Sequence, residues 1–582
     1  MLLRLYSCKI VDKSKLNEYF EDVLYDQGKG RELMLKERVN IDNIKAVKGM
    51  KFYDLILKEY KDIIDKVAIC KLNGKYHELS EIIDEDGEIK PIGFDNDFGI
   101  KIYSRTLQFI FIKAALEIFP DSKITIEQSI SKAIYGEIHK DAPLTELEIV
   151  KIKNRMQEVI DKDILIKREK VSKERALEIF SKYNMKDKIK LIENCDLKEL
   201  TLCELDGLYD YFYECMGYST GIIKVFDLQK YEDGFILRRP SPEDMTCLSE
   251  FIEQKSLYKV FLETERWLRI LDVGEVGTLN EKVKGSELQN VIMVSEALHE
   301  KKMANIADEV LKRKNVKIVL IAGPSSSGKT TFANRLSIQL RVNGLIPIPL
   351  SLDNYFVNRN NTPKDENGEY DYESIDALDL ELLNKNLSSI MQGNEVEIPA
   401  YNFKTGEREW IGDKVKLPEN GVLVIEGIHG LNPRLISNKL SGNIYKVYIS
   451  ALTQLNIDDH NRISTTDSRK VRRIVRDSLS RGYGAEETLK MWPSVKRGEK
   501  RNIFVYQEEA DSIFNSTLVY ELGVLKPFAL RELEKISNES PVYAEALRLK
   551  AFLNFFKEID INEVPKNSIL REFIGGSCFY GY

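Results

Sequence analysis

The sequence predicts an α/β protein whose C-terminal half holds a parallel sheet flanked by helices, preceded by two smaller α+β domains. Three observations lead to this prediction. At 582 residues the chain is too long for one ordinary core, so we expect two to four domains. From about residue 315 onward, apolar strand-like runs alternate with helical patterns, which is typical of a parallel sheet. A glycine-rich loop lies between the first such strand and the first such helix.

This loop, residues 323–330, reads Gly-Pro-Ser-Ser-Ser-Gly-Lys-Thr and fits the phosphate-binding pattern G-x4-G-K-[ST]. Residues 316–322 predict a buried strand before it, and residues 331–340 predict a helix after it. In that setting backbone N–H groups converge on phosphates, Lys329 reaches the terminal phosphates, and the Thr330 hydroxyl can bind Mg²⁺. A serine-rich turn is the alternative. We predict a P-loop of the NTPase type that binds ATP through Gly323, Pro324, Ser325, Ser326, Ser327, Gly328, Lys329, Thr330 and Thr331.

Composition indicates a globular protein with no strong general attraction to a charged partner. The formal charge of -7 is spread without long acidic or basic blocks, which argues against broad binding to nucleic acid or anionic membrane. Seven cysteines at irregular spacing suit a reducing cytosol. Lys113 interrupts the most apolar stretch, so no membrane span is expected. We therefore expect a cytoplasmic protein without a membrane partner.

Turn signals and periodicity divide the chain into four segments. We assign residues 1–98 to a small α+β domain with an N-terminal extension, 99–245 to a second α+β domain, 246–312 to a helical connector and 313–582 to the P-loop domain. Within them we expect a hairpin turn at Asn73-Gly74, helices over 107–119, 147–160 and 291–311, and a strand over 222–226.

Two carboxylates follow predicted strands of the P-loop domain. Glu426 ends the apolar run 422–425, and Asp353 comes just after another strand-like segment. Because ligands gather at the C-terminal ends of parallel strands, Lys329, Asp353 and Glu426 could converge. We predict that Glu426 and Thr330 hold Mg²⁺, and that Asp353 is the base that phosphoryl transfer to a hydroxyl requires. A helix cap or turn is the alternative for Asp353.

A predicted helix over 468–480 carries Arg469, Arg473 and Arg476 on one face, with Arg481 close behind. Guanidinium groups so arranged can neutralise charge on a transferring phosphoryl group. We therefore count Lys329, Asp353, Arg476 and Arg481 as candidate catalytic residues. A solvated basic helix is one alternative, and a nucleic-acid patch is another, although the aromatic residues of a stacking surface are missing.

These motifs resemble the uridine kinase and phosphoribulokinase family of P-loop kinases, within it the uridine kinase branch. The resemblance spans about 200 residues and includes the loop 323–330 and the segments 352–355, 376–379, 398–403, 425–427, 472–477 and 481–482. It implies Asp353 as the base for a nucleoside 5′-hydroxyl and Arg473 as a ribose contact, with Arg476 and Arg481 on the phosphates. It also implies Tyr401 and Phe403 around the nucleoside base.

The chain departs from the family pattern in the acceptor pocket. Glu373 stands where family members usually hold an aspartate that binds the ribose hydroxyls. Gly406 falls at the position of a histidine that recognises the pyrimidine, and Met491 lies near a polar residue with a similar task. A site without such groups discriminates less between analogues, so uridine is not expected to be a specific substrate.

The N-terminal half resembles the small TGS domain and the adjoining editing domain of threonyl-tRNA synthetases. Segments 103–106, 119–126, 171–176 and 215–217 carry this looser resemblance. The synthetase site uses two histidines on one helix face with a cysteine and a further histidine. Tyr103 and Leu107 replace the first two, and only Cys215 survives. We expect a catalytically silent domain with Cys215 as a buried thiol.

The leading hypothesis is therefore an ATP- and Mg²⁺-dependent kinase that phosphorylates the 5′-hydroxyl of a nucleoside. A kinase of phosphorylated sugars is an alternative within the enzyme class. An RNA-binding regulator with a nucleotide-gated P-loop is the alternative outside it, with RNA or tRNA contact through the N-terminal half. We expect a homo-oligomer.

Overall fold

The computed structural model describes residues 41–313, 315–366, 368–437 and 444–580. The extension predicted before the first domain falls on residues 1–40 and lies outside the described residues. Over the described part of the chain, no helix has both the length and the apolar character that crossing a membrane requires.

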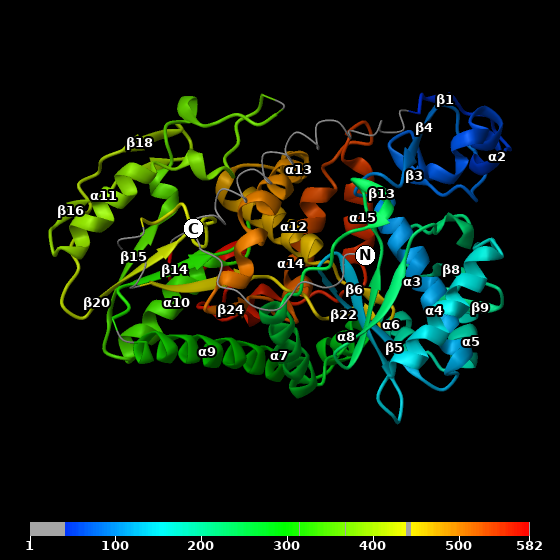
Figure 1. The fold of residues 1–582 in the computed structure, drawn as a ribbon, viewed down its shortest axis with the longest axis horizontal. Coiled ribbons are helices and arrows are strands. Elements are labelled where there is room, and N and C mark those ends of the chain that lie inside the picture. Colours follow the sequence, from blue (N-terminus) through cyan, green and yellow to red (C-terminus); the bar gives the residue numbers. More distant parts are fainter. Residues whose placement is uncertain (1–40, 314, 367, 438–443, 581–582) are drawn as a thin grey trace, which may run out of the picture.

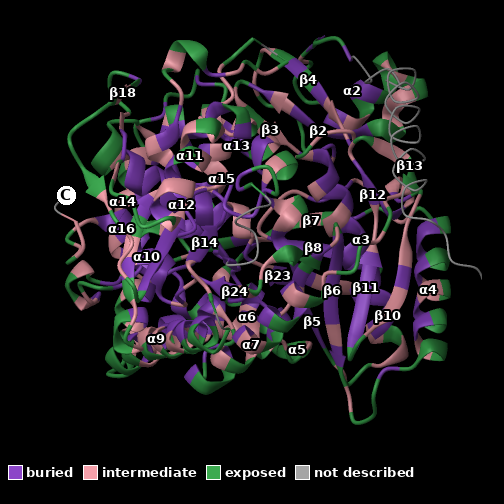
Figure 2. Ribbon diagram, turned by 60° about the vertical axis from the view of Figure 1, so that its left-hand side comes forward, coloured by how far each residue is buried: buried purple, intermediate pink, exposed green. Residues whose placement is uncertain are grey.

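The C-terminal half is built on a five-stranded sheet in the order β15-β20-β14-β21-β24, parallel throughout (Figure 1). Every residue of the central strand β14 is buried, because helices cover both faces of the sheet (Figure 2). Val319 and Ile321 pack on the side of α10 (Lys329–Val342), whereas Ile318 and Leu320 pack on the side of α11 (Leu380–Met391). The predicted parallel sheet is confirmed. The strands are β14 (Ile318–Ala322), β15 (Ile346–Ser351), β20 (Gly421–Glu426), β21 (Ile444–Ser450) and β24 (Ser512–Asn515).

Helices and short ribbons complete this half. Two antiparallel ribbons lie near α11 at one end of the molecule: β16 (Val396–Glu397) with β19 (Lys414–Val415), and β17 (Ala400–Asn402) with β18 (Glu407–Glu409) (Figure 1). The helices are α10 (Lys329–Val342), α11 (Leu380–Met391), α12 (Thr465–Arg476), α13 (Ala485–Asn502), α14 (Glu521–Leu533), α15 (Tyr543–Leu553) and α16 (Arg571–Ile574).

Residues 41–98 form a small antiparallel sheet in the order β1-β4-β2-β3, covered by α2 (Phe52–Glu59). Asn73 and Gly74 connect β2 to β3 with φ of 47° and 80°. A two-residue hairpin loop with both φ positive matches the right-handed twist of the strands, so the predicted hairpin is confirmed. The strands are β1 (Ile44–Lys45), β2 (Val67–Leu72), β3 (Lys75–His77) and β4 (Glu88–Gly93).

The segment from residue 99 to 248 combines a four-stranded sheet, β10-β11-β6-β5, with a three-stranded sheet, β7-β8-β9. Its long helix α3 (Gly99–Ile118) is buried along much of its length, and α4 (Glu146–Asp161) packs beside it. The other elements are β5 (Lys123–Ile130), β6 (Ala133–His139), β7 (Lys167–Ser172), α5 (Lys173–Lys182), α6 (Lys186–Asn194), β8 (Glu199–Leu205), β9 (Leu208–Tyr211), β10 (Asp227–Tyr231), β11 (Gly234–Arg238), β12 (Pro240–Ser241) and β13 (Asp244–Leu248).

The strand predicted over residues 222–226 is wrong. A 3-10 turn (Thr220–Ile222) stands there instead, and β10 begins only at Asp227. The Tyr103 hydroxyl accepts hydrogen bonds from the backbone N–H groups of Lys224 and Val225, at 3.0 and 2.9 Å, and donates to the Val225 carbonyl. A buried side chain therefore satisfies the backbone groups that a neighbouring strand would otherwise bind.

Three helices connect this segment to the parallel sheet: α7 (Lys255–Leu271), α8 (Val276–Lys284) and α9 (Leu288–Lys312). Helix α9 runs along one side of the molecule and packs on α10 (Figure 1). Arg335 of α10 is 2% exposed and bonds to Glu296 and Glu300 of α9. One apolar cluster runs from the β7-β8-β9 sheet through these helices into the C-terminal half.

A buried network of charged residues also joins the two halves. The hairpin of β22 (Asn456–Asp458) and β23 (Asn461–Arg462) leaves the C-terminal half and contacts β5. Lys188 of α6 bonds to Asp458 at 2.8 Å and to Asp210 at 3.1 Å. His460 bonds to the other Asp210 oxygen at 2.7 Å. Lys188, Asp210 and Asp458 are each 0% exposed, so their charges depend on one another.

Raising the pH is expected to weaken the contribution of His460 to this interface. Burial alone lowers the pKa of His460, but the Asp210 carboxylate outweighs it, so the pKa lies above its ordinary value; Lys188 and Asp187 also face the ring. A raised folded pKa stabilises the fold fully below the unfolded pKa of about 6.5, and the contribution is lost as pH rises through the folded value. The difference in thermal midpoint between wild type and H460Q should shrink from about pH 6 to about pH 9, measured by scanning fluorimetry. A constant difference would contradict this.

Candidate active site

The P-loop connects β14 to α10 in a conformation that small residues permit. Ser326 and Gly328 have φ of 59° and 87°. At Gly323 a side chain would meet the carbonyl oxygen of Ile449 at 2.1 Å, so only glycine fits there. Lys329 is the first helical residue, and its Nζ donates to the Pro324 carbonyl at 3.1 Å across the loop. The predicted strand, loop and helix are confirmed in this order.

Two serine hydroxyls of the loop fit a phosphate ligand. Ser326 and Ser327 are 2% and 0% exposed, and within the described part of the chain neither hydroxyl has a hydrogen-bond partner. Buried hydroxyls without a partner are uncommon in proteins, and here they stand at the N-terminus of α10, where unpaired backbone N–H groups attract anions. Thr330 is exposed, so its hydroxyl is open to a ligand.

Glu426 and Asp353 lie together at the C-terminal edge of the sheet, as predicted. In the strand register, Glu426 is aligned with Ser351 of β15 and with Ile321 of β14, and Ser351 Oγ donates to its carboxylate at 3.0 Å. Burial, and then the nearby charge of Asp353, raise the pKa of Glu426 to about 7. Carboxylate and hydroxyl oxygens are ligands that Mg²⁺ prefers, so the chemistry of Glu426, Asp353 and the exposed Thr330 fits the ion.

Asp477 organises the arginines that follow β23. Its carboxylate, 0% exposed, accepts from Arg473 Nε at 3.1 Å and from Arg476 Nη2 at 2.7 Å, and lies 3.7 Å from Arg481 Nε. Arg473 also donates to Ser325 Oγ of the P-loop at 3.1 Å. The arginine face is therefore turned toward the loop and buried, which excludes the solvated basic helix and the nucleic-acid patch as its explanation. Helix α12 begins at Thr465, three residues before the predicted start, and continues as a π-helical turn (Asp477–Arg481).

The sequence interpretation assigned no role to Glu499 of α13. This residue is 1% exposed, accepts a bond from the Ser325 N–H at 2.9 Å and also binds Arg469. Arg469 in turn donates to the Ser325 carbonyl at 2.9 Å. No signal in the sequence links residue 499 to the loop, because the contact depends on tertiary packing. By contrast, the role of Asp477 could have been predicted from the sequence, because this residue lies inside the arginine motif.

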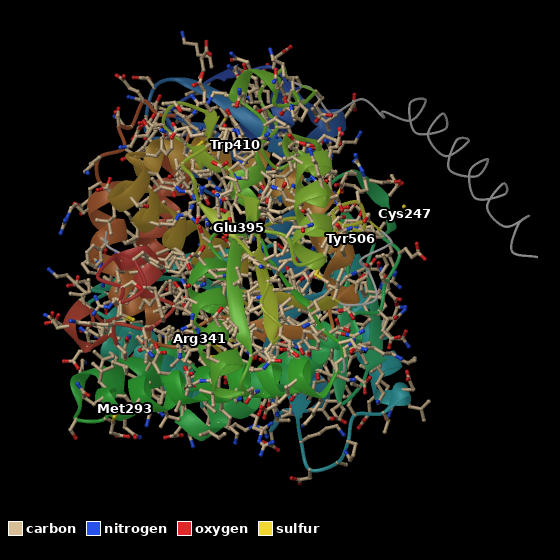
Figure 3. All side chains as sticks on the ribbon, turned by 90° about the vertical axis from the view of Figure 1, so that its left-hand side faces the viewer. Cys247, Met293, Arg341, Glu395, Trp410 and Tyr506 are labelled. Carbon is tan, nitrogen blue, oxygen red and sulfur yellow. The ribbon has the colours of Figure 1, made fainter. Side chains whose placement is uncertain are left out.

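The acceptor side of the candidate site is lined by aromatic rings. Tyr401 lies 5.1 Å from Phe403 and 5.5 Å from Phe356 between ring centroids, and the Arg481 guanidinium lies 5.9 Å from the centre of Phe403. Phe403 is 54% exposed. Trp410, which follows β18, lies at the opposite end of the molecule from Met293 of α9 (Figure 3).

Glu373 and Gly406 complete the description of the acceptor side. Burial and the neighbouring Glu499 raise the pKa of Glu373 to about 7, although Arg473 and Lys329 lie close enough to oppose the rise. Gly406 has φ of 78°, and a side chain there would meet Arg359 Nε at 2.6 Å. A histidine at residue 406 would therefore strain the backbone and would require the Arg359 side chain to move. Met491 is partly buried on α13.

The synthetase-like segment has no comparable set of reactive groups. Tyr103 and Leu107 are buried in α3, and Tyr103 fixes the backbone at residues 224 and 225. Cys215, predicted as a buried thiol, is only partly buried, and burial raises its pKa to about 12, which favours the protonated thiol. Over the residues that the structure describes, no group of three or more His, Cys, Asp and Glu side chains could hold a metal ion.

Comparison with known proteins finds similarity for part of each half of the chain. The model of the phosphoribulokinase / uridine kinase family matches residues 318–521. Residues 318–521 form a domain of this family. Among solved structures, this kinase domain is similar to a possible uridine kinase from Bacillus stearothermophilus, with 18% identity, a TM-score of 0.26 and coverage of 37% of this chain and 98% of that one. A D-glycerate 3-kinase from Cryptococcus neoformans matches with 14% identity, a TM-score of 0.21 and coverage of 44% and 87%.

The N-terminal half beside the kinase domain is similar to threonine--tRNA ligases. The enzyme of Caldanaerobacter subterraneus is 30% identical over 186 residues, which is 31% of this chain and 28% of that protein. The enzyme of Ehrlichia ruminantium is 28% identical over 188 residues, with coverage of 32% and 30%. This chain therefore spans less than a third of the length of these relatives. The two-part architecture expected from the sequence is confirmed.

Proposed function

We propose that the kinase domain transfers the terminal phosphoryl group of ATP to the 5′-hydroxyl of a nucleoside, giving the nucleoside monophosphate and ADP. One arrangement carries this proposal: the P-loop, Asp353, Glu426 and the arginines held by Asp477 surround one edge of the sheet, beside the aromatic rings of Tyr401 and Phe403. A phosphate-binding loop next to this aromatic wall of inclined, partly exposed rings suits a phosphoryl donor and an acceptor with a planar ring.

In the proposed mechanism, the P-loop backbone and Lys329 hold the ATP phosphates. Asp353 accepts the proton of the nucleoside 5′-hydroxyl. The hydroxyl oxygen then forms a bond to the terminal phosphorus of ATP while the bond from that phosphorus to the ADP oxygen breaks. Arg476 and Arg481 stabilise the negative charge on the transferring group, and Asp477 keeps both guanidinium groups oriented. Arg473 and Glu373 would contact the ribose.

Magnesium fits this scheme through Thr330 and Glu426. Held by these residues, the ion would neutralise negative charge on the phosphates during phosphoryl transfer. Glu426 shares a buried edge with Asp353, whose charge helps to raise the pKa of Glu426 to about 7, while Lys329 opposes the rise. A divalent cation would relieve this repulsion.

The aromatic wall supports recognition of the base by stacking more than by hydrogen bonds. Gly406 offers no side chain, and the adjacent Arg359 donates to the Phe403 carbonyl at 2.8 Å. Sites that bind an analogue through apolar contacts discriminate by about 10- to 200-fold, whereas sites with buried hydrogen-bonding groups reach about 10⁴ to 10⁵. We therefore infer a kinase with modest preference among nucleoside bases.

Turnover with several nucleosides is expected in a screen of the purified protein with ATP and Mg²⁺, followed by ADP release. The kcat/KM values of the accepted nucleosides should lie within about 200-fold of one another. The matched control is the 5′-deoxy form of the best acceptor, which keeps the ring and the ribose but has no hydroxyl to phosphorylate. Turnover with a pentose phosphate alone would favour the sugar-phosphate alternative. No turnover with any nucleoside would contradict the proposed function.

A further inference from the structure

The last part of the chain folds back onto the P-loop. We call residues 561–580 the C-terminal strap; it contains a 3-10 turn (Ile561–Glu563) and α16. Arg571 ties it together by donating to the carbonyls of Ile561 at 2.9 Å and Val564 at 2.6 Å. Ile569 and Phe573 are 0% and 1% exposed. The strap is therefore a packed element with its own internal bonds.

Its contacts concentrate at the start of α10. The Glu572 carboxylate accepts from the Thr331 backbone N–H at 3.0 Å and from the Thr331 hydroxyl at 2.9 Å. The Tyr580 hydroxyl bonds to the same threonine, so the described end of the chain lies beside the N-terminus of α10. At Gly328 a side chain would meet Ile569 at 2.5 Å, which shows how closely the strap covers the loop.

This position matters because the start of a helix is an anion site. The first backbone N–H groups of α10 lack partners within the helix, and phosphate is their expected ligand in a P-loop. Thr331 is the third residue of α10, and its backbone N–H donates a hydrogen bond to Glu572. A carboxylate there offers negative charge to the same donors that would bind a nucleotide, and it repels phosphate oxygens nearby.

The strap also contacts the arginine helix. The Phe573 ring centre lies 5.0 Å from the Arg472 guanidinium of α12, which is 0% exposed. Arg472 donates to the Ser326 carbonyl of the P-loop at 3.4 Å and binds Glu521 at 2.6 Å. Movement of α16 would therefore change the contacts of both the P-loop and the helix that carries the arginines.

We propose that the C-terminal strap is an autoinhibitory element of the nucleotide site, in which Glu572 competes with ATP phosphates for the N-terminus of α10. The inference rests on the proposed function, because it takes ATP as the ligand of the P-loop. Nucleotide binding requires the Glu572 carboxylate to leave Thr331, and the docked strap lowers the affinity for ATP.

E572Q in the full chain tests this inference. Glutamine keeps the shape and still accepts a bond from the Thr331 N–H, but it carries no charge, so the fold should persist. Calorimetric titration with ATP and Mg²⁺, without any acceptor, is expected to show about tenfold tighter binding than wild type, in the range of charge effects at a helix N-terminus. E558Q is the matched control: it removes the same charge from an exposed residue that precedes the strap, and its ATP affinity should equal that of wild type.

Hydrogen exchange of the wild type gives a second measurement that needs no variant. Saturating ATP is expected to increase amide exchange over residues 568–580 and to decrease it over the P-loop. Equal ATP affinity of E572Q and wild type, with unchanged exchange in the strap, would overturn the inference and leave the proposed function standing. Absence of ATP binding in wild type and E572Q alike would instead contradict the proposed function itself.

Discussion

D353N is expected to lower kcat by about 10² to 10⁴ while ATP still binds, the range that loss of a general base produces. Asparagine has the shape of aspartate but cannot take up the hydroxyl proton. The backbone N–H of Asp353 donates to Ser351 Oγ at 3.3 Å. Because this bond does not use the Asp353 side chain, the substitution leaves the turn intact. Removing this charge also removes its repulsion of the Glu426 carboxylate, which helps to raise the pKa of Glu426. Nucleotide affinity should therefore not fall.

Steady-state kinetics with the best nucleoside, together with calorimetric titration of ATP, separate the two effects. D413N serves as the control, because Asp413 is exposed beyond the β17–β18 ribbon and outside the candidate site. It should keep the kcat of the wild type. A D353N enzyme with more than about a third of the wild-type kcat would remove Asp353 from the role of base. A loss of ATP affinity in D353N would assign it to nucleotide binding.

Local sequence patterns were enough to predict where the candidate residues stand on the parallel sheet and its helices. The P-loop, Glu426 after β20, Asp353 after β15 and the arginines of α12 each lie within a few residues of the element that positions them. Backbone geometry then decides where they point. Glu499 and Glu572 could not be predicted in this way, because they reach the loop from segments about 170 and 240 residues later in the chain. Only packing of α13 and of the strap brings their carboxylates there.

The fold shows the same division between local and long-range information. The Asn73-Gly74 turn and the strand of residues 318–322 depend on local conformation and hydrophobicity, and both predictions are confirmed. The apolar run 222–226 has the composition of a strand, but Tyr103 binds its backbone from more than a hundred residues away. Side-chain capping of a loop leaves no periodic signal.

Lys188 is the second residue whose loss should have a large effect. K188M is expected to destabilise the chain by about 3 to 5 kcal/mol, because it removes the buried cation that Asp458 and Asp210 share and leaves Asp210 with His460 alone. Both carboxylates are 0% exposed, and Asp458 lies in the hairpin that leads directly into α12. We therefore expect the thermal midpoint to fall and kinase turnover to fall with it, since the hairpin fixes the start of the arginine helix.

K190M provides the matched control on the same helix. Its side chain is 43% exposed and lies 3.8 Å from Glu281, a surface pair worth about 0 to 1 kcal/mol. A combined K188M, D210N and D458N variant distinguishes buried charge from lost packing, because neutral amides remove the unpaired charges and should restore part of the stability. If K188M unfolds at the temperature of K190M, the network does not hold the two halves together. If the combined variant is no more stable than K188M, the loss comes from packing of the lysine stem. Recovery of both stability and turnover would show that the synthetase-like half supports the kinase site through the hairpin ahead of α12.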